Sequence, residues 1–405
     1  MLTFSNLKLW DVEKRRFEVR DIEVDYNPSL IKLNQNNIDC RDYLGVPLGV
    51  DAHVSFREPG YEYQEDILSG AEAALYGGVL TVLDMPNTKP ITDSVETLKQ
   101  KQIIARKQNV VDIKIAAAIH DRNIEKIKEL SHYCDAFKIY ITAPSEDLFI
   151  EEDKITLALS NLEDINSNKP VIFHAEDPNI LKSKNKEISF YKRRPAEAEA
   201  VALQKILQWA KDFANLKFHV THLSSSLSLR LLELSNISNL TSDTCPHYLF
   251  FNQFSDLDEE IKMVNPPLRQ EFDNQALLQA LSVGIIDMIT SDHLPHTIEE
   301  KIQEKAIGVP GVQELLPVLF TLVHSGELEW ERAIEAYHLF PSQLLNLTEK
   351  PISENLLIID PFTPISVDSE WIKSKAGWSI FQNMMLYGSL KYVIKNSQLI
   401  IQIDN

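Results

Sequence analysis

Histidine, aspartate and lysine side chains recur along the middle of the chain in short polar motifs, each within or just after an apolar run. The motifs are Asp51-Ala52-His53, Phe137-Lys138-Ile139-Tyr140, His174-Ala175-Glu176, Thr221-His222 and Ser291-Asp292-His293. Imidazole and carboxylate groups are typical ligands of zinc and similar cations. A single histidine after an apolar run is more often a hydrogen-bonded core residue, but several possible ligands in matching positions indicate a metal site.

Lys138 is the least expected of these side chains, because it lies inside an apolar segment. Burying an unpaired ammonium group is costly, so a lysine in such a place tends to lose its proton and become a nucleophile. A neutral amine can take up carbon dioxide to form a carbamate. The carbamate is an anionic oxygen ligand that can bridge two metal ions, and we therefore include Lys138 among the candidate ligands.

Eight apolar runs separated by helical patterns must position these motifs. We predict strands at Leu48–Val54, Val79–Met85, Ile113–Ala118, Ala136–Ile141, Pro170–His174, Lys217–His222, Leu240–Thr244 and Ile285–Thr290. Strands that alternate with helices favour a closed, parallel (β/α)8 barrel of the TIM type. The strand ends of such a barrel converge on one face, where active sites are assembled. A doubly wound open sheet is the alternative fold, but no Gly-rich dinucleotide-binding turn follows the first strand.

The two ends of the chain have a different pattern from the middle. Residues 1–46 and 346–405 contain short segments that alternate between apolar and polar side chains, as half-exposed strands do. We predict that residues 47–345 form the catalytic barrel and that the two terminal regions pair into one small β-sheet domain. The alternative is that each terminal region decorates the barrel separately.

The composition limits the partners and the compartment. The 405 residues include 40 Lys and Arg against 59 Asp and Glu, a formal charge of −19, which argues against nucleic acid or anionic lipid as the main partner. A small anionic substrate is compatible with this charge, because it needs only a local cationic pocket. Three scattered cysteines, no signal-like segment after Met1 and no apolar stretch of about 18 residues predict a cytoplasmic protein without a membrane span.

The stretch DAHVSFREPG at Asp51–Gly60 resembles the dihydroorotase signature, which reads Asp-x-His-x-His-x-Arg-Glu-Pro-Gly. Later motifs resemble those of the same family in the same order, and they are Asp84–Thr88 (DMPNT), Phe137–Tyr140 (FKIY), His174–Glu176 (HAE), Asn265–Arg269 (NPPLR) and Ser291–Thr297 (SDHLPHT). The first and last motifs are specific among amidohydrolases, whereas FKIY and HAE are shared with hydantoinases and allantoinases.

This resemblance implies two metal positions that share a Lys138 carbamate, with zinc as the metal and one or two ions per chain. The implied protein ligands are His53 and Asp292 at one position, and His174 and His222 at the other. The residues implied to contact a substrate carboxylate are Arg57, Asn87 and His296, with Asn265 nearby as a further substrate-binding residue. The planar guanidinium of Arg57 suits a carboxylate, and Asp292 would act as general base and then as general acid.

The activity implied by the resemblance is the reversible interconversion of dihydroorotate and N-carbamoyl-L-aspartate, a step of pyrimidine biosynthesis. The implied partners are this small anionic substrate and a second copy of the chain in a homodimer, with aspartate transcarbamoylase as a further candidate. A hydantoinase- or allantoinase-type hydrolase is an alternative. Arg57 and His296 favour a substrate with a carboxylate, which simple hydantoins lack.

Ser55 departs from the first motif, because it occupies the place of the second histidine. A neutral hydroxyl is a poor metal ligand beside imidazole, so we expect the position of His53 and Asp292 to bind metal more weakly. Two interpretations follow: an enzyme with a weakened second metal position, or a catalytically silent relative that serves as an assembly partner. We favour the enzyme, since Lys138, Asp292 and Arg57 are all retained.

Overall fold

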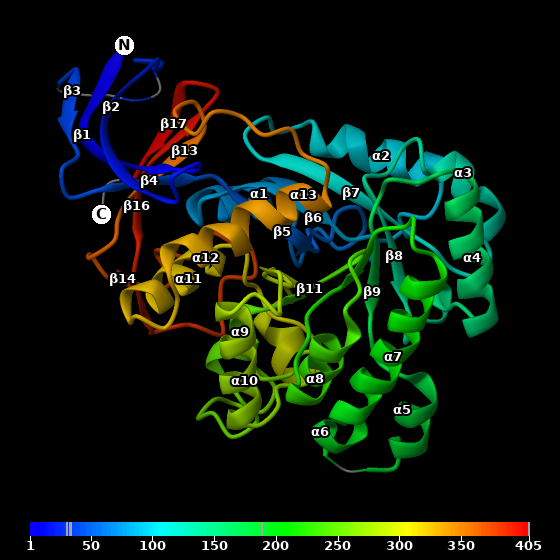
Figure 1. Ribbon diagram of the computed structural model, residues 1–405. Helices are drawn as coiled ribbons and strands as arrows, with labels where there is room; N and C mark the ends of the chain where they lie inside the picture. Colours follow the sequence, from blue (N-terminus) through cyan, green and yellow to red (C-terminus); the bar gives the residue numbers. More distant parts are fainter. Residues whose placement is uncertain (30, 32–34, 144, 188, 404–405) are drawn as a thin grey trace.

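Eight parallel strands form the centre of the molecule in the computed structural model, which describes residues 1–29, 31, 35–143, 145–187 and 189–403 (Figure 1). The strands are β5 (Gly49–Val54), β6 (Val79–Asp84), β7 (Asp112–Ala118), β8 (Ala136–Tyr140), β9 (Val171–His174), β10 (Phe218–Val220), β11 (Leu240–Thr244) and β12 (Met288–Ile289). Their order in the sheet follows the chain. A bridge between Val54 and His293 joins the first strand to the segment after the last one, so the sheet closes. The predicted (β/α)8 barrel is confirmed.

Helices surround the barrel on its outer side (Figure 1). They are α1 (Ile67–Tyr76), α2 (Val95–Ala105), α3 (Ile127–Leu130), α4 (Glu152–Asp164), α5 (Pro178–Lys184), α6 (Phe190–Arg193), α7 (Ala196–Asp212), α8 (Ser226–Ser235), α9 (Pro246–Phe250), α10 (Glu271–Ser282), α11 (Leu315–His324), α12 (Trp330–Ile334) and α13 (Phe340–Leu344). Short 3-10 turns are η1 (Ile124–Lys126) and η2 (Glu146–Leu148), and π-helical turns are η3 (Glu300–Glu304) and η4 (Glu335–Leu339). In α7 the buried residues Ala198, Ala202 and Ile206 recur at helical spacing, and Trp209 of the same helix stacks on Phe173 of β9.

Two strands are shorter than the sequence predicts by several residues, whereas the ends of the other six differ from the prediction by at most one residue. The expected strand Lys217–His222 is reduced to β10, because His222 adopts a left-handed backbone with a φ of 50° and leaves the ladder. The expected strand Ile285–Thr290 is reduced to β12, because the amides of Ile285 and Ile286 donate to the Ala280 carbonyl at the end of α10. In both cases the candidate ligand lies in a loop just beyond the strand.

Strands from both ends of the chain form a second sheet beside the barrel (Figure 1). They are β1 (Leu2–Asp11), β2 (Arg16–Val24), β3 (Asn37–Asp39), β4 (Leu44–Pro47), β13 (Leu356–Asp360), β16 (Ser389–Lys395) and β17 (Gln398–Gln402). Strand β4 pairs with β1 on one side and with β13 on the other, and so joins the two ends of the chain. The predicted small sheet from both termini is confirmed, while its exact domain limits stay a prediction. A separate pair is β14 (Ile365–Ser366) with β15 (Met385–Leu386).

The second sheet has its own apolar core, apart from the core of the barrel. Phe4, Leu7, Leu356 and Ile394 belong to it and are fully buried. Strand β4 leads directly into β5, so this core holds the start of the first barrel strand in place. In the part of the chain that the structure describes, none of the helices combines the length and apolar character that crossing a membrane requires.

Candidate active site

The predicted site residues all line one cavity of about 970 Å³. They are His53, Ser55, Arg57, Asn87, Lys138, His174, His222, Asn265, Asp292 and His296. Most of them lie at the C-terminal ends of barrel strands or in the loops that follow, as the barrel predicts. A second cavity, of about 530 Å³, contains none of them among its lining residues.

Two pairs of candidate metal ligands face each other in this cavity. The Nδ1 atom of His174 lies 3.2 Å from Nε2 of His222, and Nε2 of His53 lies 3.5 Å from Oδ1 of Asp292. The ring centroids of His53 and His222 are 5.5 Å apart, which places both pairs beside one another. Four possible ligand atoms therefore converge on one region.

Two of these imidazoles form a hydrogen bond through the ring nitrogen that is not part of the facing pair. Nδ1 of His53 lies 2.6 Å from the Thr221 hydroxyl, and Nε2 of His174 lies 2.9 Å from the Glu176 carboxylate. Burial opposes ionisation of Glu176, but its bonds to His174 and Arg194 outweigh this effect and lower its pKa to about 2. An ionised Glu176 accepts the Nε2–H of His174, which leaves a lone pair on Nδ1 directed at the cavity.

Lys138 is fully buried, and its Nζ has no hydrogen-bond partner among the described residues. Burial lowers the pKa of Lys138 to about 7 and raises the pKa of Asp292 to about 8. The ammonium form is therefore disfavoured in the way that the sequence predicts. An unpartnered amine of lowered pKa beside imidazoles and the Asp292 carboxyl group fits a lysine that becomes a carbamate and binds metal.

These donors fit zinc, because imidazole nitrogens and carboxylate oxygens are its usual ligands. A second possible set is Cys245, His247 and Asp292, whose ligand atoms lie within 4.8 Å of one another. Cys245 and His247 are buried and are not among the residues that line the cavity, and burial raises the pKa of the Cys245 thiol well above its usual value. The set with His53 is open to a substrate, and we take it as the candidate metal centre.

Ser55, Asn87 and Arg57 form one hydrogen-bonded unit on the cavity wall. The Ser55 hydroxyl donates to Oδ1 of Asn87 at 3.1 Å, and Nη1 of Arg57 donates to the Asn87 carbonyl at 2.9 Å. Nε of Arg57 donates to Gln64 at 2.7 Å, and the guanidinium lies 4.4 Å from the centre of the Tyr61 ring. Nη2 of Arg57 forms no hydrogen bond within the described ranges, so it is the free donor for an anion.

His296 is placed differently from Arg57. Its Nε2 lies 3.1 Å from the Ile307 carbonyl, and its Nδ1 lies 3.2 Å from Nε2 of Gln64. Burial lowers the pKa of His296 to about 4, so the ring is neutral and both nitrogens are engaged. Binding of a carboxylate by His296 therefore requires one of these bonds to open, whereas Arg57 can bind it without rearrangement.

Three candidate site residues adopt a backbone conformation that is rare for residues other than glycine. The φ angles are 62° at Arg57, 50° at His222 and 48° at Asp292. Such conformations persist only where the surrounding structure holds them, and they gather at functional sites. The strain fits a site whose geometry is set by the barrel rather than by local preference.

Sequence reasoning missed several residues that hold the site. Gln64 forms hydrogen bonds with both Arg57 and His296. The Glu176 carboxylate accepts hydrogen bonds from His174 and Arg194. A signal existed for Glu176, because it belongs to the motif His174-Ala175-Glu176, just beyond the end of β9. Gln64 and Arg194 lie in loops, where no periodicity indicates the direction of a side chain.

The chain resembles known families in sequence. Residues 44–154 match the family described as Dihydro-orotase-like. Similar curated proteins include the dihydroorotases of Methanosarcina acetivorans (32% identical, covering 86% of this chain and 79% of that protein) and Methanosarcina mazei (33% identical, covering 86% and 81%). The dihydroorotase of Caldicellulosiruptor saccharolyticus is 30% identical and covers 93% of this chain and 90% of that protein.

Solved structures share the whole fold at lower sequence identity. The L-hydantoinase (dihydropyrimidinase) from Arthrobacter aurescens superposes with a TM-score of 0.87 at 21% identity, covering 99% of this chain and 97% of that chain. The D-hydantoinase (dihydropyrimidinase) from a Thermus species has a TM-score of 0.85 at 18% identity, with 99% and 95% covered. At this identity the likeness concerns the fold.

Proposed function

The chain belongs to the dihydroorotase family, and we propose that it interconverts dihydroorotate and N-carbamoyl-L-aspartate. It is a hydrolase that acts on cyclic amides, as its dihydroorotase relatives indicate. One observation carries the choice of substrate. The free Nη2 donor of Arg57 shares a cavity with the buried, unpartnered amine of Lys138, so a group that binds a carboxylate lies in the same space as the candidate metal centre.

We propose zinc as the metal, held by the ligands that converge in the cavity. The Lys138 carbamate with His53 and Asp292 would hold one ion, and the same carbamate with His174 and His222 the other. Bound zinc supplies a lowered pKa for water and polarises a carbonyl group. Three observations support this assignment: the unpartnered Lys138 amine with its lowered pKa, the Nδ1 lone pair of His174 and the 3.5 Å approach of His53 to Asp292.

The protein groups then have separate roles. Arg57 binds the substrate carboxylate through Nη2, and Asn87 orients the ring, because Ser55 occupies its Oδ1 and leaves its Nδ2–H bonds for the substrate. During hydrolysis water adds to the ring amide carbonyl and the C–N bond breaks. Asp292 accepts the proton from water at a carboxylate oxygen and passes it to the departing nitrogen. In the reverse direction the same proton returns as the ring closes.

Ser55 does not remove the case for an enzyme. Its hydroxyl donates to Oδ1 of Asn87, and the other predicted groups line the cavity. We therefore propose an active hydrolase with one or two zinc ions per chain, the position of His53 and Asp292 being the weaker.

The test is turnover of dihydroorotate in both directions by the purified chain, with zinc content measured on the same sample and Asp292→Asn as matched control. We expect turnover by the zinc-loaded chain and its loss in the control. Absence of turnover at full zinc occupancy would contradict the proposal. So would faster hydrolysis of unsubstituted hydantoin, which has no carboxylate for Arg57.

A further inference from the structure

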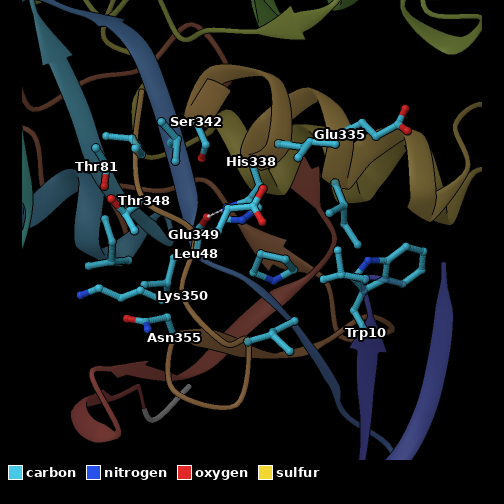
Figure 2. A pocket seen from close by; sticks show the side chains of 18 of the residues that line it. Trp10, Leu48, Thr81, Glu335, His338, Ser342, Thr348, Glu349, Lys350 and Asn355 are labelled. Atoms are coloured by element: carbon cyan, nitrogen blue, oxygen red, sulfur yellow. Dashed lines mark hydrogen bonds between the residues drawn. The ribbon is translucent and has the colours of Figure 1, made fainter. Parts of the chain in front are cut away.

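A second cavity, of about 530 Å³, lies at the end of the barrel where the strands start, opposite to the candidate active site. Figure 2 shows side chains that line it. Its walls come from the starts of β5, β6 and β7, from the helical segment η4–α13 and from the small terminal sheet. Cavities that bind small molecules commonly have about 300–1,000 Å³ and occur where structural units meet. The position and the size of this cavity fit such a site.

Most of the wall is apolar. Leu48, Leu80, Ile334, Leu347 and Ile352 contribute aliphatic side chains, and Trp10 of β1 adds an indole. Aliphatic and aromatic walls with a few placed polar groups are the usual composition of ligand pockets. The cavity would therefore favour a compact ligand with an apolar body.

Three nitrogen atoms at this cavity have no partner within the described part of the chain. Trp10 is 5% exposed, and its Nε1–H, which is turned toward the cavity in Figure 2, makes no hydrogen bond. Nδ2 of Asn355 is buried without a partner. Nδ1 of His338 bonds the Leu48 carbonyl at 2.8 Å, so that nitrogen carries the proton and Nε2 keeps a lone pair. Burial lowers the pKa of His338, which keeps the ring neutral.

The charged residues around the cavity favour no ion. Arg15 is paired with Glu331, and Nζ of Lys395 lies 3.1 Å from Asp112. Nζ of Lys114 lies 3.7 Å from the Asp135 carboxylate outside the cavity. Lys350 and Glu349 add one charge of each sign to the lining, and Nζ of Lys350 donates to Oδ1 of Asn396 at 2.7 Å. The lining charges are therefore balanced, and Trp10, Asn355 and His338 offer two N–H donors and one nitrogen acceptor.

We propose that this cavity binds an uncharged, planar nitrogen heterocycle. A ring nitrogen of the ligand accepts from Trp10 or Asn355, a ring N–H donates to Nε2 of His338, and the flat apolar faces lie against the aliphatic walls. Nδ2 of Asn355 is a buried donor without a partner, which is unfavourable, so a ligand that supplies its missing bond gains affinity. The site is separate from the proposed catalytic centre and does not depend on the proposed activity.

The test uses benzimidazole as the probe, because it combines a ring acceptor and a ring N–H in one flat molecule. The full chain is prepared with isotope-labelled tryptophan, and the indole N–H signals of its five tryptophans are followed by NMR. Trp10→Phe identifies the Trp10 signal. We expect this signal to shift on titration with a dissociation constant on the order of 1 mM or lower.

Two comparisons decide where and how the probe binds. His338→Asn keeps a donor near the Leu48 carbonyl but removes Nε2, and we expect the dissociation constant to rise by about 2- to 12-fold. Indole, which has the N–H but no ring acceptor, should bind more weakly than benzimidazole to the unaltered chain. A Trp10 signal that does not move, or equal affinity of the unaltered chain and His338→Asn, would overturn the proposal.

Discussion

Ser55→Ala separates a substrate-positioning role of Ser55 from a metal-binding one. Ser55 is 3% exposed, and its hydroxyl donates to Oδ1 of Asn87 at 3.1 Å. Alanine removes only the hydroxyl, so the Asn87 amide can rotate and its Nδ2–H bonds are no longer directed at the substrate. We expect weaker substrate binding with an unchanged zinc content.

The expected rise in KM follows from the loss of one neutral hydrogen bond. Such a bond contributes about 0.5–1.5 kcal/mol, which corresponds to a rise in KM of about 2- to 12-fold. The kcat should change less, because the Ser55 hydroxyl donates to Asn87 and not to the proposed general base Asp292. Asn87→Ala should have an effect of similar size, and the double variant should be less than additive, because both substitutions break the same bond.

The assay is steady-state hydrolysis of dihydroorotate by protein whose zinc content is measured in the same preparation. Ser55→Thr is the matched control, since it keeps the hydroxyl and should retain most of the affinity. Ser55→His should raise the number of zinc ions per chain while it removes the bond to Asn87. If Ser55→Ala loses zinc, or if its KM equals that of the unaltered chain, Ser55 does not act through Asn87.

Four further outcomes test other parts of the structure. Lys138→Ala should lose zinc, and a short carboxylic acid such as acetate should restore part of it; metal analysis showing full zinc content without the acid would exclude a bridging role. Arg57→Ala should lower kcat/KM for dihydroorotate by about 10- to 150-fold, from about 1.5–3 kcal/mol for a charged hydrogen bond, without a change in zinc content. Lys101→Met should lower the free energy of unfolding by about 3–5 kcal/mol in denaturant titrations, because it leaves the buried Asp84 carboxylate without its ion-pair partner. Nζ of Lys101 lies 3.0 Å from Asp84, and both side chains are fully buried. The double variant Lys101→Met with Asp84→Leu should recover much of the loss. In metal-free protein the pKa of Glu176 lies at about 2, below its usual 4.5, so its contribution to the free energy of unfolding is complete above about pH 4.5 and is lost as the pH falls toward 2. Over that range the free energy of unfolding of the unaltered chain should fall by about 3 kcal/mol more than that of Glu176→Gln. Parallel stability profiles of the two proteins would refute this.

Much of the candidate site could be read from the sequence because local patterns carry it. Apolar runs predicted the barrel strands, and barrel geometry then required that His53, Lys138 and His174 meet at one face. Lys138 was recognisable because an ammonium group inside an apolar run is costly wherever the run is buried. These inferences needed only side-chain type and strand direction, which are properties of short segments.

The tertiary structure decided which polar groups pair. Ser55 donates to Asn87, and Gln64 reaches both Arg57 and His296, because closure of the barrel sets the distances between loops that the sequence leaves open. The second cavity depends even more on the tertiary structure. Trp10, His338 and Asn355 carry no common motif, and they meet only because strands from both ends of the chain form one sheet against the base of the barrel. Side-chain periodicity determines the face of an element on which a residue lies, whereas its partner depends on how distant elements pack.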